Sequence, residues 1–127
     1  MPSRILIVDD EPGVADLIDT VLKGEGYTVA IARDGVEGLM LAREWDPDLI
    51  LMDVMLPGLD GGAAIRRLKN DPATAGIPIV AMSAASNIRR LREELKEADG
   101  ALSKPFDIDS LLAQVAFHLT RRDTEEA

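Results

Sequence analysis

Hydrophobic residues along the chain fall into short runs separated by longer periodic segments. Unbroken apolar runs occupy residues 5–8, 49–52 and 79–82, as expected for strands buried on both faces of a sheet. Residues 27–31 alternate more and residues 101–103 form a short run, both typical of edge strands. The pattern therefore predicts three central strands and two edge strands.

Helical periodicity occupies the segments between and after these runs. Val14, Leu17, Ile18, Val21 and Leu22 follow the i, i+3, i+4, i+7, i+8 spacing of a helix with one buried face. Four further helices are predicted over residues 34–45, 60–69, 86–98 and 107–121. Each predicted strand is followed by one predicted helix.

This alternation predicts the fold class. Strand–helix–strand units require right-handed crossovers and a mostly parallel sheet that is covered on both faces. We therefore predict a doubly wound α/β protein, a three-layer (βα)5 sandwich of the flavodoxin-like type with strand order 2-1-3-4-5. Residues 1–121 are expected to form one domain, and residues 122–127 a disordered polar tail.

Composition and charge narrow the classes of function. The chain has 127 residues, 46% hydrophobic and 29% charged, with a formal net charge of -9. Such a negative field disfavours direct binding to nucleic acid or to anionic membranes. There is no cysteine and only one histidine, which excludes disulfides and thiolate or histidine-rich metal sites. No apolar run is long enough to span a membrane, so we expect a cytoplasmic protein.

Polar residues follow four of the predicted strands. Asp9 and Asp10 end the first strand, Asp53 the third, Ser83 the fourth and Lys104 the fifth. Ligands of open parallel sheets bind beyond the carboxyl ends of the strands, where these side chains converge. Three carboxylates in a small volume favour a bound cation, and Mg²⁺ suits an all-oxygen ligand set with a phosphate group nearby.

Asp53 is the candidate nucleophile because it ends an apolar run and does not begin a helix. An aspartate can attack a phosphoryl group and carry it as a mixed anhydride. Lys104 would neutralise the phosphoryl oxygens, and the hydroxyl of Ser83 would donate a hydrogen bond to one of them.

Simpler interpretations stay open for each residue taken alone. Asp9, Asp10 and Glu11 are also good residues for the start of a helix. Ser83 is suited to cap the next helix, and Lys104 to lie in solvent on an edge strand. The convergence of all these residues on one rim favours the functional interpretation.

The sequence resembles the receiver domain of two-component response regulators over residues 3–119. The motifs that carry the resemblance are ILIVDDEP at residues 5–12, LMDVMLPGLDG at 51–61, AMSA at 81–84 and SKPF at 103–106. The resemblance implies that a sensor histidine kinase or a phosphotransfer protein donates a phosphoryl group to Asp53. It also implies a domain that assists its own phosphorylation and dephosphorylation but is not an enzyme acting on an external substrate.

The same resemblance implies the other site residues. Mg²⁺ would be held by Asp10, Asp53 and the backbone carbonyl of Met55, with Asp9 acting through water. The hydroxyl switch would be Ser83, the lysine would be Lys104, and the peptide bond between Lys104 and Pro105 would be cis. Output would reach a downstream protein through the surface of residues 86–98, 101–103 and 107–121.

Two residues depart from the family pattern. Ala101 stands where most members have a tyrosine or phenylalanine that couples to the hydroxyl switch, which favours an alternative, an interaction module that does not depend on phosphorylation. Met55 places an apolar side chain beside the site, where it could slow hydrolysis of the acyl phosphate. A magnesium phosphohydrolase is a further alternative, but the second acid expected two residues after the nucleophile is missing here.

A cluster of arginines and the single histidine lie outside the candidate site, and neither is assigned a role in its chemistry. Arg89, Arg90 and Arg92 are expected to form a solvated face that pairs with nearby glutamates. His118 is expected at the surface or at the edge of the core.

Overall fold

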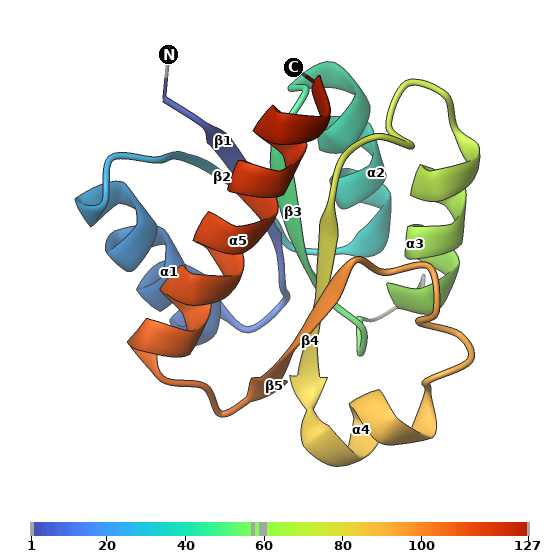
Figure 1. The fold of residues 1–127 in the computed structure, drawn as a ribbon. Coiled ribbons are helices and arrows are strands. Elements are labelled where there is room, and N and C mark those ends of the chain that lie inside the picture. Colours follow the sequence, from blue (N-terminus) through green and yellow to red (C-terminus); the bar gives the residue numbers. More distant parts are fainter. Residues whose placement is uncertain (1, 57, 59–60, 127) are drawn as a thin grey trace.

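Strands and helices alternate along the chain in the computed structural model, which describes residues 2–56, 58 and 61–126 (Figure 1). The strands are β1 (Arg4–Val8), β2 (Thr28–Ala32), β3 (Leu49–Asp53), β4 (Ile79–Ala84) and β5 (Gly100–Lys104). The helices are α1 (Pro12–Gly24), α2 (Gly35–Glu44), α3 (Gly61–Asn70), α4 (Ala85–Arg90) and α5 (Ile108–Glu126). The predicted order of elements is confirmed.

The strands form one parallel sheet in the order β2-β1-β3-β4-β5. Asp53 pairs in register with Met82, and Ser83 with Ser103. The carboxyl ends of β1, β3, β4 and β5 therefore lie along one edge of the sheet. The predicted flavodoxin-like fold class is confirmed.

Alternate residues of the strands build a core on each face of the sheet. On one face, Leu6, Ile50 and Ile79 pack with residues of α2 and α3 and with Leu95. On the other face, Ile7 and Val80 pack with α1 and α5. Figure 1 shows the corresponding layers, with α1 and α5 on one side of the sheet.

The residues predicted to begin the first two helices lie at the N-termini of α1 and α2. Pro12 occupies the first turn of α1, where its missing N–H removes no helical hydrogen bond. The carboxylate of Asp34 caps α2 by accepting from the backbone N–H of Glu37 at 2.8 Å. The side chain of Glu37 accepts from the backbone N–H of Arg33 at 3.4 Å, so the reciprocal contact is made one residue earlier than in a capping box.

Helix α4 is shorter than the predicted helix over residues 86–98, which was wrong in its extent. It ends at Arg90, and residues 91–97 form turns in which the amide of Leu95 still donates to the carbonyl of Leu91 at 3.0 Å. The apolar spacing of these leucines directs both toward the core without a continuous helix.

The arginines of this segment do not make the expected ion pairs. Across the described residues, no ion pair joins the arginines at 89, 90 and 92 to a glutamate. The expected pairing on this face was therefore wrong.

The last helix extends further than the periodicity predicted. Asp107 accepts from the backbone N–H of Ser110 at 2.7 Å at its start, and α5 continues to Glu126. The domain boundary predicted at residue 121 and the predicted disorder of residues 122–127 stay predictions.

The third helix was predicted to begin at Asp60, which lies outside the described residues. In the described part of the chain, no helix combines the length and the apolar character needed to cross a membrane.

Candidate functional site

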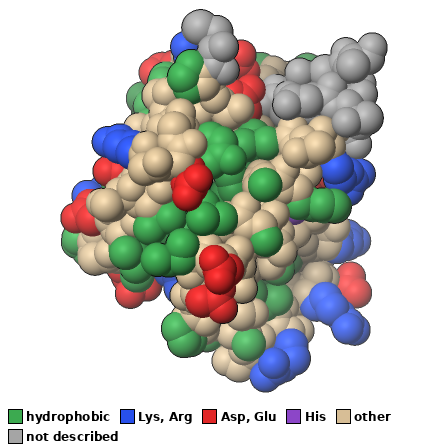
Figure 2. All heavy atoms as spheres, turned by 60° about the vertical axis from the view of Figure 1, so that its left-hand side comes forward, with side chains coloured by type: hydrophobic (Ala, Val, Ile, Leu, Met, Phe, Trp, Pro, Cys, Tyr) green, Lys and Arg blue, Asp and Glu red, His purple; other side chains and the backbone are tan. Residues whose placement is uncertain are grey.

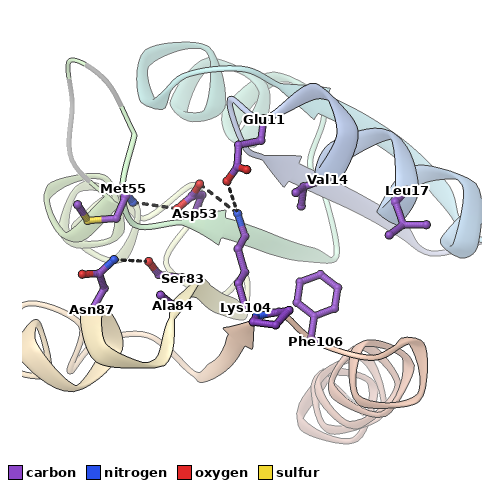
Figure 3. Close-up of a pocket in the computed structure, with 11 residues that line it drawn as sticks. Glu11, Val14, Leu17, Asp53, Met55, Ser83, Ala84, Asn87, Lys104 and Phe106 are labelled. Carbon is purple, nitrogen blue, oxygen red and sulfur yellow. Dashed lines mark hydrogen bonds and ion pairs between the residues drawn. The ribbon is translucent and has the colours of Figure 1, made fainter.

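The sheet edge brings together side chains from four strand ends. Asp9 follows β1, Asp53 is the last residue of β3, Ser83 lies near the end of β4, and Lys104 is the last residue of β5. Figure 3 shows Asp53, Ser83 and Lys104 directed toward one cavity. The predicted convergence of these residues on one rim is observed.

Lys104 is the centre of the charge arrangement. Its Nζ lies 2.7 Å from Oδ2 of Asp9, 3.2 Å from Oε1 of Glu11 and 3.3 Å from Oδ2 of Asp53. Only 17% of its side chain is exposed, so it is not the solvated edge-strand lysine of the simpler interpretation. One ammonium group thus faces three carboxylates.

The ammonium group of Lys104 stays charged in this setting. Burial alone would lower the pKa of Lys104, but the hydrogen bond to Asp9 and the charges of Asp53 and Asp9 outweigh burial and raise the pKa. A permanent positive charge is therefore held beside Asp53.

Asp53 is a buried carboxylate with a raised pKa. The residue is 3% exposed. Burial raises the pKa of Asp53. The hydrogen bond from the Met55 N–H and the charge of Lys104 both lower the pKa, but burial outweighs them. The backbone N–H of Met55 donates to Oδ1 of Asp53 at 2.9 Å, which fixes the carboxylate and leaves Oδ2 facing Lys104.

Three carboxylates are close enough to share a cation. Ligand oxygens of Asp9, Asp10 and Asp53 all lie within 4.8 Å of one another. Asp9 and Asp53 are buried and Asp10 is exposed, so the group opens to solvent on one side. This all-oxygen set is of the kind that hard divalent cations prefer.

The simpler capping interpretations do not describe the contacts observed. Glu11 is the N-cap of α1, but its side chain makes no capping hydrogen bond and contacts Lys104 instead. Asp9 accepts from the backbone N–H of Glu11 at 2.9 Å, before the helix begins. Ser83 does not cap α4, because the N-cap there is Ala84.

Two residues of the site were missed by the sequence analysis. Glu11 was considered only as a helix-start residue, although it contacts Lys104. Asn87 was not considered, although its Nδ2 donates to the hydroxyl of Ser83 at 3.2 Å. The i, i+4 spacing of Ser83 and Asn87 was the available signal.

A cavity of about 520 Å³ opens over these groups. Asp53, Ser83 and Lys104 line its charged end, and Val14, Leu17 and Phe106 line an apolar wall (Figure 3). Leu17 is 54% exposed. Figure 2 shows hydrophobic side chains gathered on the side of the molecule that carries α1 and α5.

The backbone next to the site is tightly packed. A Cβ atom on Gly61 would clash with the Cα of Val54 and lie 2.8 Å from the carbonyl oxygen of Asp53, so α3 can begin this close to β3 only with glycine. The peptide bond between Lys104 and Pro105 is cis, as the family resemblance implied.

The remaining residues singled out in the sequence lie away from the nucleophile. Ala101 is exposed on β5 and lines a second cavity, of about 370 Å³, with Ile88 and Leu95. His118 on α5 is buried, with 3% of its surface exposed, and its ring lies beside Gln114 and Gly100, so it is not a surface residue.

Comparison with known proteins places this arrangement in context. A family model described as the response regulator receiver domain matches residues 5–116. The DNA-binding dual master transcriptional regulator RpaA of Synechocystis is 42% identical over 121 residues, which cover 94% of this chain and 50% of that protein. The chain thus spans about half the length of such relatives.

Two solved structures share the fold closely. A putative response regulator from Chloroflexus aurantiacus superposes with a TM-score of 0.88 at 35% identity, covering 94% of this chain and 99% of that one. The receiver domain of sensor histidine kinase PA1611 from Pseudomonas aeruginosa has a TM-score of 0.87 at 30% identity, covering 94% of this chain and 99% of that one. That structure has a magnesium ion coordinated in its active-site cleft.

Proposed function

The chain belongs to the response regulator receiver domain family of two-component systems, and from this membership we propose that Asp53 accepts a phosphoryl group in a Mg²⁺-dependent reaction. One observation carries the proposal. Asp53 is buried, lies 3.3 Å from Lys104, and has the carboxylates of Asp9 and Asp10 close enough to hold a cation with it. A nucleophile, a fixed positive charge and a metal-binding group therefore share one cavity.

In the proposed reaction, Oδ2 of Asp53 forms a bond to phosphorus. The bond between phosphorus and the donor breaks, and its electron pair leaves with the donor, which is the imidazole of a histidine kinase or of a phosphotransfer protein. The Met55 N–H holds Oδ1 of Asp53, so Oδ2, which faces Lys104, is the proposed attacking atom. Lys104 is already within reach of the phosphoryl oxygens that would develop beside Oδ2.

Ser83 would complete the set of donors. Its buried hydroxyl lines the same cavity as Asp53 and accepts a hydrogen bond from Asn87. The hydroxyl proton can therefore be donated to a phosphoryl oxygen on Asp53.

Asp10, Asp53 and the backbone carbonyl of Met55 are the proposed ligands of Mg²⁺, with Asp9 acting through water. The cation would supply positive charge that neutralises the phosphoryl oxygens. The carboxylate oxygens of Asp9, Asp10 and Asp53 fit this role in number, chemistry and spacing.

The partners follow from the surfaces around the site. The apolar wall of Val14, Leu17 and Phe106 beside Asp53 suits the docking of a phosphodonor protein. We propose that the domain assists its own phosphorylation and dephosphorylation and does not act on an external substrate. A downstream protein would bind the surface of α4, β5 and α5.

Direct binding to nucleic acid is not part of the proposal, because the net charge of -9 opposes it. The DNA-binding relatives are about twice as long as this chain, so their DNA binding is not transferred to it. We propose a cytoplasmic location, where a kinase of this kind would meet the domain.

Ala101 favours a second candidate function, an interaction module whose partner binding does not depend on phosphorylation. Its methyl group is exposed on β5 and has no ring that could move in response to Ser83. Equal partner affinity with and without the phosphoryl group would support this candidate.

Intact-mass measurement tests the main proposal. Wild-type protein incubated with a small-molecule phosphodonor and Mg²⁺ should gain the mass of one HPO₃ group, and omission of Mg²⁺ should abolish the gain. Asp53→Asn should gain nothing. The matched control is Asp46→Asn, an exposed aspartate outside the site, which should behave as wild type. A gain that persists in Asp53→Asn would refute the assignment.

A further inference from the structure

The cavity over Asp53 has more space than a phosphoryl group alone would fill. Its volume of about 520 Å³ is in the range of pockets that hold small organic ligands. Asp53, Ser83 and Lys104 supply polar atoms at one end of it. The remaining space can hold a chemical group that enters attached to the phosphoryl group.

The wall of that remaining space is apolar. Val14 and Leu17 lie on α1, and Phe106 follows β5. Figure 3 shows these three side chains beyond Lys104, on the side away from Met55. Leu17 is 54% exposed, so part of the wall is open to a ligand. An apolar group that covers the wall gains binding free energy roughly in proportion to the area removed from water.

The geometry of phosphoryl transfer directs the leaving group into this space. The attacking and leaving oxygens lie roughly in line through phosphorus. Asp53 is buried at the base of the cavity, with Oδ1 held by the Met55 N–H and Oδ2 facing Lys104. A leaving group opposite Oδ2 therefore points away from the sheet, into the open part of the cavity.

The charges around the cavity disfavour a second negative group on the donor. Glu11 lines the cavity, and the exposed carboxylate of Asp10 lies beside Asp53. Among the described residues that line the cavity, Lys104 is the only cation, and it already faces three carboxylates. A carboxylate on the leaving group would lack a cationic partner there and would be repelled by Glu11.

We propose that Val14, Leu17 and Phe106 form a subsite for the leaving group, which makes acyl phosphates with an uncharged, apolar acyl group the preferred small-molecule donors. The inference rests on the proposed function, because it requires Asp53 to be the phosphoacceptor. It adds a selectivity among donors that the proposed function does not contain.

The reaction with such a donor balances without a further reagent. Oδ2 of Asp53 forms a bond to phosphorus, and the bond between phosphorus and the acyl oxygen breaks. The electron pair of that bond leaves on the acyl oxygen, so the product is the free carboxylate. An acyl phosphate is a mixed anhydride, and the bond formed at Asp53 is of the same kind as the bond that breaks.

The rates of adduct formation with three donors test the selectivity. Acetyl phosphate, benzoyl phosphate and 4-carboxybenzoyl phosphate are each supplied at the same low concentration with Mg²⁺, and intact mass measures the initial rate. Wild type should react faster with benzoyl than with acetyl phosphate, because the phenyl ring covers apolar wall that a methyl group does not. 4-Carboxybenzoyl phosphate should lose most of that advantage, because its ring carries a negative charge.

Variants of the wall separate binding from the intrinsic reactivity of the donors, which cancels when the benzoyl-to-acetyl rate ratio is compared between proteins. Leu17→Ala should lower this ratio by about threefold to tenfold, since a half-exposed side chain contributes less than a fully buried one. Leu17→Met, which keeps an apolar side chain of similar size, should restore the ratio. The matched control is Met40→Ala, a residue of α2 that is 55% exposed and does not line the cavity, and it should give the wild-type ratio.

The outcomes distinguish this inference from the proposed function. Absence of an adduct with every donor in wild type would overturn both. Adducts that form with the same benzoyl-to-acetyl ratio in wild type and Leu17→Ala would overturn the subsite alone. Equal rates with benzoyl and 4-carboxybenzoyl phosphate in wild type would also overturn the subsite alone.

Discussion

Lys104 lies closer to Asp9 than to Asp53, with Nζ at 2.7 Å from the former carboxylate and 3.3 Å from the latter. The side chain of Asp9 is fully buried, and Lys104 is the cation that lies against it. Lys104 therefore has two roles in the unmodified protein. It forms an ion pair with the buried carboxylate of Asp9, and it places a positive charge beside Asp53, the candidate nucleophile.

Replacing Lys104 should lower stability as well as phosphorylation. Lys104→Met removes the cation and leaves Asp9, Glu11 and Asp53 facing one another, which should lower the free energy of unfolding by about 3 kcal/mol without Mg²⁺. Urea denaturation measures the loss. Because a bound cation compensates the same charges, the deficit should shrink in Mg²⁺. An equal deficit with and without Mg²⁺ would contradict a shared cation site.

Met55 is expected to prolong the life of the acyl phosphate. Its side chain is 50% exposed and lines the cavity over Asp53, where it limits the approach of water. Met55→Asn should shorten the half-life of the phosphorylated protein by about threefold, a change of under 1 kcal/mol in the barrier. Loss of the adduct over time, followed by intact mass, measures this. An unchanged half-life would remove the hypothesis.

The strand ends could be predicted from the sequence, but the contacts between their side chains could not. Apolar runs identify buried strands, and the parallel topology then places Asp9, Asp53, Ser83 and Lys104 at one edge. Which carboxylate lies nearest to Lys104 depends on side-chain rotamers. Spacing alone does not determine these.

The end of α4 shows a second limit of sequence patterns. The apolar spacing of Leu91 and Leu95 predicted a helix, and both residues do pack against the core. The helix nevertheless ends at Arg90 and residues 91–97 form turns, so apolar spacing alone does not distinguish successive turns from a continuous helix. The contact between Asn87 and Ser83 could not be predicted for a related reason, because a polar residue on a short helix contributes nothing to a hydrophobic pattern.

His118 should make stability depend on pH. Burial lowers the pKa of His118, the charge of Asp99 opposes that shift and the charge of Arg121 adds to it. Gln114 is its hydrogen-bond partner, and Lys69 pairs with Asp99 nearby. The folded protein therefore takes up the histidine proton less readily than the unfolded chain.

This difference in proton uptake determines how the free energy of unfolding changes with pH. As pH falls from about 7 toward about 5, the unfolded chain gains the proton first, so the free energy of unfolding decreases until the folded form is also protonated. His118→Gln should remove this contribution, which denaturation of both proteins across the range would measure. The chain has one histidine, so the difference between wild type and variant isolates its effect. A difference that does not vary with pH would contradict the account.

The most direct test of the central claim is to locate the phosphoryl group by reductive trapping. Borohydride converts an aspartyl phosphate to homoserine, and peptide mass spectrometry identifies the residue converted. After reaction with a small-molecule phosphodonor and Mg²⁺, homoserine should appear at position 53, and it should be absent when either reagent is omitted. Conversion at another aspartate, or none in folded protein, would contradict Asp53 as the phosphoacceptor.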